Sequence, residues 1–461
     1  MNINDITSVY FVGAGGIGMS ALVRYFLTKG KKVAGYDLTP SDLTADLIAE
    51  GAAIHYEEDE ALIPDEFRER ETTWVVYTPA VPEAHKELVY FRNNGFEVMK
   101  RAQILGLITQ SARGLCIAGT HGKTTTSSMT AHLLNNSTIG CNAFLGGILK
   151  NTDSNLMLSE QSDLTVIEAD EYDRSFHYLT PYMAVITAAD PDHLDIYQTP
   201  QAYRESFERF TSLVRPGGAL IIKKDIDVRP HLQPDVRLFT YSMTDETADY
   251  HAENIRVGQG EIIFDFVAPS LRVADVQLGV PIRINIENGI AAMALASLNG
   301  VTDEEMRAAM KSFAGAKRRF DFQIKKERLI YIDDYAHHPA ELRSCILSVK
   351  ELYEGRRLTG IFQPHLYTRT RDFADEFAAS LSLLDRLILL DIYPAREAPI
   401  PGITSAMILD KALNKSKILC KKEQLLQTLE NEDLDILLTL GAGDIDRFVN
   451  PITELLNKKY H

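Results

Sequence analysis

Cysteine is scarce in this sequence of 461 residues, and the four that occur, Cys116, Cys141, Cys345 and Cys420, lie far apart without a C-x-x-C pair. This excludes a zinc ribbon and a disulfide scaffold, and it predicts a reducing compartment. No apolar run approaches the roughly 18 residues of a transmembrane helix, and the N-terminus lacks the basic segment and long apolar run of a signal peptide. We therefore predict a cytoplasmic protein with no membrane partner.

Positive charge is also in short supply, because 48 Lys and Arg residues face 64 Asp and Glu residues, which gives a net charge of −16. This balance does not support a nucleic-acid partner, although a local basic pocket can still hold phosphates. The hydrophobic fraction of 45% is that of a globular protein. At about 150 residues per domain, the length predicts about three domains.

One pattern recurs along the chain: a short apolar run, then glycine or polar residues, then a helical pattern. It appears as VYFVGAGG (from Val9), LCIAGTHGK (from Leu115), LTVIEADE (from Leu164), MAVITAADPDH (from Met183), LIYIDDYAHH (from Leu329), LTGIFQPHLY (from Leu358), LILLDIYPA (from Leu387) and ILLTLGAGD (from Ile436). Such runs are typical of buried parallel strands, so they predict an α/β fold with ligands at the carboxyl ends of the strands.

Three domains are predicted from where this pattern restarts. Residues 1–110 begin with a strand, a glycine loop and a helix, and residues 111–315 begin with a second glycine loop. Within the second domain, the alternating stretch from about residue 223 to 281 predicts a small antiparallel sheet beside a parallel one. Residues 316–461 repeat the strand-then-loop pattern.

The first glycine loop, Gly13–Gly18, fits G-x-G-x-x-G directly after a predicted strand. Glycines there allow backbone N–H groups to approach a diphosphate at a helix N-terminus. Asp37 ends the next strand, near the spacing expected of an acid that binds a ribose hydroxyl. The motif alone leaves three alternatives: a dinucleotide, another nucleoside diphosphate, or a glycine turn without a ligand.

The second glycine loop, Gly119–Thr126, contains Gly-Lys-Thr between a strand and a helix. In such a loop the backbone cradles phosphate, Lys123 pairs with phosphate oxygens and the Thr124 hydroxyl binds Mg²⁺. The standard P-loop spacing fails, because Ile117 stands where a glycine is required. A structural turn with a surface lysine is the alternative. We expect Lys123→Ala to abolish activity with little loss of stability, since an exposed loop lysine supports no core.

A phosphate loop predicts acidic metal ligands on neighbouring strands. Glu168–Asp173 and Asp190–Asp195 are acidic segments that each follow a predicted strand. Runs of acids are usually solvated loops, but their place beside the Gly-Lys-Thr loop favours metal binding.

The ordered motifs GAGGIGMS, GTHGKTTT, EADEYDRSF, DHLDIY, DDYAHHPAE, FQPHLYTRTRDF and LGAGDI resemble those of the Mur ligase family, over all three predicted domains. The resemblance implies an N-terminal Rossmann-like domain for a UDP-sugar, a central P-loop ATPase-like domain and a C-terminal Rossmann-like domain for the amino acid. It implies an ATP-dependent ligase of peptidoglycan synthesis, and hence of cell-wall biogenesis, cell shape and division.

Within the family, the motifs are most similar to those of members that join L-alanine to the lactoyl carboxylate of UDP-N-acetylmuramate through an acyl phosphate. A branch that adds a whole tripeptide to the same sugar is the nearest alternative. A nicotinamide-dependent dehydrogenase leaves the Gly-Lys-Thr loop without a role, and a non-enzymatic nucleotide-binding module leaves the two acidic segments without one. A monomer or a homodimer is expected.

The resemblance also implies the site residues. The catalytic residues are Lys123, Glu168, His193, His337 and Arg369. The ATP-binding residues are Gly119, Thr120, His121, Gly122, Lys123, Thr124, Thr125, Asn288, Arg319 and Asp334. The UDP-sugar-binding residues are Gly13, Gly15, Gly16, Gly18, Met19, Ser20, Asp37, Thr78, Arg101, His121, Glu171 and Ser175. The ligands of Mg²⁺, or of Mn²⁺, are Thr124, Glu168 and His193.

Three positions depart from the family pattern. Ala188 stands where the family usually has asparagine, Ile284 where it has histidine, and Leu366 where it has arginine. The last change matters most, because leucine cannot pair with an anion. Arg371 and Arg396 are candidates to replace that arginine on spacing alone.

Overall fold

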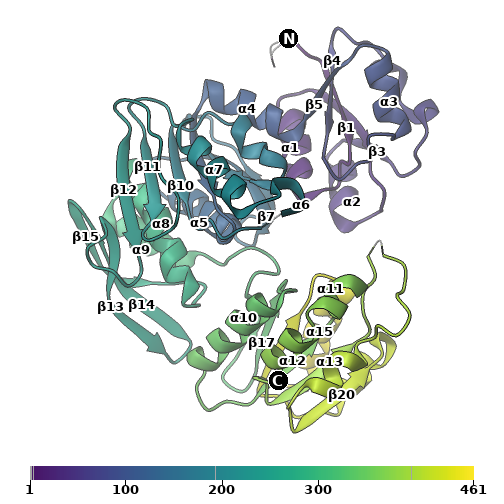
Figure 1. Cartoon of the computed structure of the whole chain (residues 1–461), viewed down its shortest axis with the longest axis vertical. Helices are drawn as coiled ribbons and strands as arrows, with labels where there is room; N and C mark the ends of the chain where they lie inside the picture. Colours follow the sequence, from purple (N-terminus) through teal and green to yellow (C-terminus); the bar gives the residue numbers. More distant parts are fainter. Residues whose placement is uncertain (1–2, 4, 193, 396, 461) are drawn as a thin grey trace. The chain divides into compact units, whose positions relative to one another are not determined.

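The computed structural model describes residues 3, 5–192, 194–395 and 397–460, and within them three β-sheets follow one another along the chain (Figure 1). Most neighbouring strands run parallel, and helices connect them. This confirms the predicted α/β fold. No helix within these residues is both long and apolar enough to cross a membrane.

The N-terminal sheet has the strand order β3-β2-β1-β4-β5, and all its pairs are parallel. Its strands are β1 (Ser8–Val12), β2 (Lys32–Tyr36), β3 (Ala53–His55), β4 (Thr73–Tyr77) and β5 (Glu97–Lys100). Its helices are α1 (Ile17–Thr28), α2 (Asp42–Ala49), α3 (Lys86–Asn93) and α4 (Arg101–Ser111), with 3₁₀ turns η1 (Glu60–Leu62) and η2 (Asp65–Phe67). Every residue of β1 and β4 is buried, as expected for parallel strands covered on both faces.

The central sheet has the order β15-β14-β13-β12-β11-β10-β6-β9-β7-β8. Its strands are β6 (Arg113–Ala118), β7 (Asn142–Leu149), β8 (Ser154–Met157), β9 (Leu164–Ala169), β10 (Met183–Ile186), β11 (Ala219–Lys223), β12 (Arg237–Ser242), β13 (Tyr250–Gly258), β14 (Glu261–Ala268) and β15 (Leu271–Gln277). The region predicted as a small antiparallel sheet beside the parallel one belongs to this same sheet, because β12 pairs parallel with β11 and β13 begins parallel to β12.

Helices cover this sheet (Figure 1). They are α5 (Lys123–Asn135), α6 (Leu194–Tyr197), α7 (Pro200–Thr211), α8 (Ile284–Leu298) and α9 (Asp303–Ser312), with the 3₁₀ segment η3 (Tyr172–Tyr178). One hydrophobic cluster runs from Phe26 of α1 and Trp74 of β4 to Phe144 and Phe176 of the central region. It holds the first glycine loop beside β7 and β9.

The C-terminal sheet has the order β16-β17-β21-β18-β19-β20, with β16 antiparallel to β17 and the other pairs parallel. Its strands are β16 (Asp321–Lys325), β17 (Ile330–Asp334), β18 (Leu358–Phe362), β19 (Arg386–Leu390), β20 (Ser416–Cys420) and β21 (Ile436–Leu440). Its helices are α10 (Pro339–Leu352), α11 (Tyr367–Asp372), α12 (Ala374–Leu381), α13 (Ala406–Lys411), α14 (Leu425–Glu430) and α15 (Val449–Lys459), with η4 (Lys422–Gln424) and η5 (Asp444–Phe448).

The chain divides into two compact units. The first comprises Met1–Asn254, Phe264–Val276 and Ile286–Ala314, and the second comprises Ile255–Ile263, Gln277–Asn285 and Gly315–His461. The predicted domain limits near residues 110 and 315 stay predictions.

Candidate functional site

The first glycine loop connects β1 to α1, and its close neighbours explain why glycine is needed. Gly13 has φ +89°, and a Cβ there would lie 2.7 Å from the Thr78 methyl group. A Cβ at Gly18 would lie 2.2 Å from Nη1 of Arg101. A helix N-terminus beside a guanidinium suits a diphosphate.

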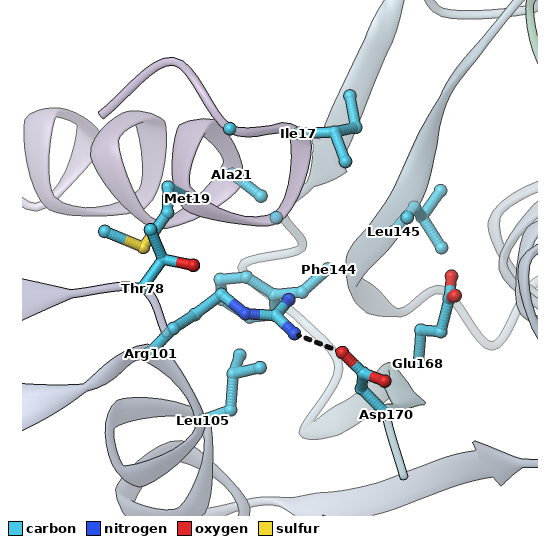
Figure 2. Close-up of a pocket in the computed structure, with 13 residues that line it drawn as sticks. Ile17, Met19, Ala21, Thr78, Arg101, Leu105, Phe144, Leu145, Glu168 and Asp170 are labelled. Atoms are coloured by element: carbon cyan, nitrogen blue, oxygen red, sulfur yellow. Dashed lines mark hydrogen bonds and ion pairs between the residues drawn. The ribbon is translucent and has the colours of Figure 1, made fainter. Parts of the chain in front are cut away.

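A pocket of about 300 Å³ lies between this loop and the central sheet (Figure 2). Its lining residues are Gly16, Ile17, Gly18, Met19, Ala21, Thr78, Arg101, Leu105, Phe144, Leu145, Gly146, Glu168 and Asp170. Five predicted UDP-sugar residues are among them. The pocket also contains Glu168, which the sequence assigned to metal binding, so the two predicted sites share one cavity.

Arg101 is the main cation of the pocket, and its Nη2 lies 3.4 Å from Oδ2 of Asp170 (Figure 2). Sequence reasoning missed Asp170 in this role and also missed Phe144 and Leu145, which form an apolar wall. The wall comes from β7, whose Gly-Gly pair after an apolar run was the available signal.

The other predicted UDP-sugar residues lie outside the pocket lining. Gly15 donates its N–H to Oδ2 of Asp37 at 2.7 Å, so this carboxylate supports the loop. The Ser20 hydroxyl is fully buried, donating to the Ile17 carbonyl and accepting from Asn155. Ser175 is also buried. Roles in ligand binding for these residues stay predictions.

The phosphate loop lies between β6 and α5. Gly119 has φ +141°, and a Cβ there would lie 2.1 Å from Oγ1 of Thr187. Gly122 has φ +83° and immediately precedes α5. Both positions need glycine, so this shorter loop is a tight turn that presents the N-terminus of α5.

Lys123 does not have the exposed position expected from its loop. Its Nζ lies 2.7 Å from the Gly119 carbonyl oxygen and 2.9 Å from Oε1 of Glu171. The Glu171 side chain is 2% exposed and that of Lys123 is 14% exposed. Burial raises the pKa of Glu171, and the charge of Lys123 opposes that rise. The premise that Lys123 is an exposed loop lysine is therefore wrong, and we now expect its removal to lower stability. Glu171 contacts the phosphate-loop lysine, and its predicted contact with the sugar stays a prediction.

Thr124 and Glu168 meet as a metal site requires. The Thr124 hydroxyl donates to Oε1 of Glu168 at 3.0 Å, while Oε2 of Glu168 is buried without a hydrogen bond to any described residue. Burial raises the pKa of Glu168, and Lys123 and Thr124 oppose this. A hydroxyl and a carboxylate are hard oxygen donors, so this pair fits Mg²⁺. His193 lies outside the described residues.

Within the described ranges, no group of three or more His, Cys, Asp or Glu residues is arranged so that it could hold a metal ion by itself.

Other residues of the phosphate loop make hydrogen bonds to neighbouring segments of the central region. The Thr120 N–H donates to the Ala188 carbonyl at 3.2 Å, and its hydroxyl bonds the Tyr203 hydroxyl at 2.8 Å. His121 is exposed, its carbonyl accepting from Thr187, and Thr125 is partly exposed on α5. Ala188 therefore acts through its backbone, which alanine supplies as well as asparagine.

Asn288 also reaches the phosphate loop. Its Oδ1 accepts from the Thr126 hydroxyl at 3.3 Å, and a Cβ at Gly122 would lie 2.7 Å from the same oxygen. The side chain is buried, at 6% exposure. The structure thus brings it to the loop from α8, more than 160 residues away in sequence.

In the second unit, the two arginines of the GAKRRFD segment differ. Arg319 is exposed, with its guanidinium over the Tyr335 ring at 5.4 Å. Arg318 pairs with buried Asp333 at 3.3 Å and binds the Gly441 carbonyl. Arg318 therefore anchors the segment, and Arg319 is left accessible.

The carboxylate of Asp334 is hydrogen-bonded to backbone N–H groups. Its two oxygens accept from the N–H groups of Phe320 at 2.7 Å and Ala336 at 2.8 Å. Burial raises its pKa to about 6, while those two N–H groups oppose the rise. This carboxylate orders the loop that carries His337, and its predicted contact with ATP stays a prediction.

His337 is held in one orientation. Its Nδ1 lies 3.0 Å from the Tyr335 carbonyl, which can only accept, so Nδ1 carries the proton and Nε2 is left as a base. Burial lowers its pKa, which favours the neutral ring. Glu341 accepts from the N–H groups of His337 and His338, which starts α10 with a capping box.

Arg369 lies in the first turn of α11. Its Nη1 is buried and makes no hydrogen bond to the described part of the chain. Leu366 precedes α11 with φ +71°, an unusual conformation for leucine. An unpaired buried guanidinium nitrogen is costly, so Arg369 is suited to meet an anionic ligand.

Models of one family match nearly the whole chain. The Mur ligase family catalytic domain matches residues 8–113, the Mur ligase middle domain matches residues 117–296, and the glutamate ligase domain of Mur ligases matches residues 318–443. The chain belongs to the Mur ligase family.

Relatives within the Mur ligase family match over the full length. A UDP-N-acetylmuramate–L-alanine ligase from Parabacteroides distasonis is 67% identical over 100% of this chain and 99% of that relative. The enzyme of that name from Phocaeicola vulgatus is 62% identical over 100% of both chains.

Solved Mur ligase structures share the fold. The UDP-N-acetylmuramate-alanine ligase from Thermotoga maritima has a TM-score of 0.82 and 27% identity, covering 98% of this chain and 99% of its own. A murein peptide ligase from Psychrobacter arcticus has a TM-score of 0.66 at 20% identity, with 98% of each chain covered, and supports the fold alone.

Proposed function

We propose that this Mur ligase uses ATP to join L-alanine to the lactoyl carboxylate of UDP-N-acetylmuramate in peptidoglycan synthesis. Full-length relatives named for this reaction support the proposal. The structural observation that carries it is the single pocket lined by both Gly18 and Glu168. A UDP-sugar with its diphosphate at the glycine loop would extend its far end to the phosphate-transfer groups.

The proposed chemistry follows from the substrate. A carboxylate is a poor acyl donor, so a carboxylate oxygen first attacks the γ-phosphorus of ATP, which gives an acyl phosphate and ADP. The amine of alanine then attacks the acyl carbon, and the tetrahedral oxyanion collapses to an amide and inorganic phosphate. Lys123 and Arg101 would offset the negative charge that gathers as two anions meet.

Mg²⁺ is part of this proposal. Thr124 and Glu168, with His193, would hold the ion, which when bound neutralises phosphate charge. Glu168 must be ionised for this role. The positive charge of Lys123 favours that form.

In the second unit, Arg369 would bind the alanine carboxylate. Its Nη1 supports this role, because it is buried and makes no hydrogen bond to a described residue. Nε2 of neutral His337 would accept the proton that the alanine ammonium must lose before attack. Alanine bound at Arg369 would place its amine toward this base. Arg319, exposed beside Tyr335, would reach the nucleotide.

We retain three further expectations as part of the proposal: three domains divided near residues 110 and 315, a cytoplasmic location, and a monomer or homodimer. The four cysteines support the location, since all are free and buried.

The test is phosphate release from ATP and Mg²⁺ with UDP-N-acetylmuramate and either L-alanine, the tripeptide L-Ala-D-Glu-diaminopimelate or no acceptor. We expect release only when both the sugar and L-alanine are present. Release with the tripeptide alone would move the protein to the tripeptide-adding branch. No release with either acceptor would contradict the proposed ligase.

A further inference from the structure

The loop that follows β19 is joined to the loop that leads into α11. The Leu366 N–H donates to the Tyr393 carbonyl at 2.9 Å, and the Tyr393 N–H donates to the Pro364 carbonyl at 2.8 Å. The ring of His365 stacks on that of Tyr393 with centroids 5.8 Å apart. The backbone immediately before Arg369 is therefore fixed from a segment more than twenty residues further along the chain.

A carboxylate from the loop that follows β19 accepts hydrogen bonds from the first turn of α11. Oε2 of Glu397 accepts from the Thr368 N–H at 3.0 Å, and Oε1 accepts from the Thr368 hydroxyl. These donors hold the pKa of Glu397 below its ordinary value. The residue directly before the helix, Leu366, makes no side-chain cap. Glu397 thus supplies from a distance the cap that the local sequence lacks.

The capped residue is the immediate neighbour of Arg369. α11 has only six residues, Tyr367–Asp372, and so short a helix has little stability of its own. Its first turn is held by Glu397 at Thr368 and by the bridge to Tyr393 at Leu366. If the cap is removed, the turn that carries the guanidinium loses one of its two fixed points.

We propose that Glu397 is a positioning residue for alanine binding: it holds the first turn of α11 so that Arg369 meets the alanine carboxylate. The inference rests on the proposed function, in which Arg369 binds that carboxylate. Glu397 itself touches no substrate, and it acts through Thr368.

The experiment compares Glu397→Ala and Glu397→Gln with the wild type, using phosphate release and varying one substrate at a time. We expect Glu397→Ala to raise the KM for L-alanine about tenfold, because small misplacements of an orienting group are costly. The KM values for ATP and UDP-N-acetylmuramate should stay unchanged. Glu397→Gln should restore most of the alanine affinity, since its carbonyl accepts from the Thr368 N–H and its amide donates to the hydroxyl.

Glu376→Ala is the matched control, because Glu376 is an exposed carboxylate on neighbouring α12. Its KM values and its Tm should equal those of the wild type, whereas the Tm of Glu397→Ala should fall slightly, because that variant loses a helix cap. A double variant, Glu397→Ala with Thr368→Val, should raise the KM for alanine no further than Glu397→Ala alone, because both changes remove one contact.

Three results would overturn the inference. In the first, all three KM values rise together, which indicates general damage. In the second, Glu397→Gln is as impaired as Glu397→Ala, so that charge and not capping matters. In the third, Glu397→Ala leaves the KM for alanine unchanged. Arg369→Ala separates a failure of the inference on Glu397 from a failure of the proposed function. If Arg369→Ala also leaves the KM for alanine unchanged, the proposed role of Arg369 fails as well. If Arg369→Ala raises that KM, only the inference on Glu397 fails.

Discussion

Gly146→Ala tests how tightly the position of Glu168 is set. Gly146 lies on β7 without a positive φ, so alanine fits its backbone conformation. The added Cβ would lie 2.1 Å from Oε2 of Glu168. To reach an ordinary contact of 3.4 Å, the carboxylate must move by about 1.3 Å. That shift breaks the 3.0 Å bond from Thr124.

The expected loss in kcat is about 100-fold, or about 2.7 kcal/mol, as for other angstrom-scale displacements of a catalytic group. Stability should change by no more than about 1 kcal/mol, because the crowded atoms are the far end of a flexible side chain and alanine restricts the unfolded chain. The assay is phosphate release over a Mg²⁺ titration, together with thermal unfolding.

Gly114→Ala is the control, since the Cβ added to this strand glycine of β6 would crowd the Thr109 side chain, at 2.9 Å from its methyl and 3.3 Å from its Cβ, and not a predicted site residue. It should keep wild-type kcat. The reasoning is refuted if Gly146→Ala keeps more than about half of the wild-type kcat, or if its loss in kcat is accompanied by unfolding.

Three further predictions concern ionisable groups that are buried or partly buried. Lys123→Ala should abolish ligation and lower the free energy of unfolding by about 2 kcal/mol, because it leaves buried Glu171 without its partner. Adding Glu171→Gln should restore stability but not activity. Denaturant unfolding that finds Lys123→Ala as stable as wild type would contradict this. Arg101→Ala should raise the KM for UDP-N-acetylmuramate at least about tenfold through loss of a charged contact, leaving the KM for alanine as a control that should not move. Burial raises the pKa of Glu87 from 4.5 to about 7, so the stability of the wild type should fall as pH rises across that interval. Glu87→Gln should remove this dependence of stability on pH. Identical Tm–pH curves for the two proteins would show that Glu87 titrates normally.

The sequence allowed prediction of both glycine loops and the strands around them, because buried parallel strands and tight turns impose strong local patterns. The apolar run before Gly13 and the one before Gly119 each became a fully or almost fully buried strand. Thr124 and Glu168 were correctly expected to meet, since strand ends in one parallel sheet share an edge.

Side-chain direction within a motif could not be predicted. Glu168 and Glu171 are three residues apart and chemically alike, yet one lines the pocket and the other is buried against Lys123. The turn after β9 decides this, and no spacing rule describes that turn. Likewise, adjacent Arg318 and Arg319 separate because Arg318 adopts φ +62° and points toward Asp333.

The pairing of Lys123 with Glu171 also bears on which anions the loop accepts. In the proposed function, a nucleotide arriving there would compete with the Glu171 carboxylate, which pairs with the lysine. A single phosphate offers little more charge than Glu171 does, whereas a triphosphate with its metal ion offers several contacts at once. After transfer, Glu171 would pair with the lysine again as the remaining diphosphate leaves. The Lys123–Glu171 pair would thus discriminate against small anions and favour departure of the spent nucleotide.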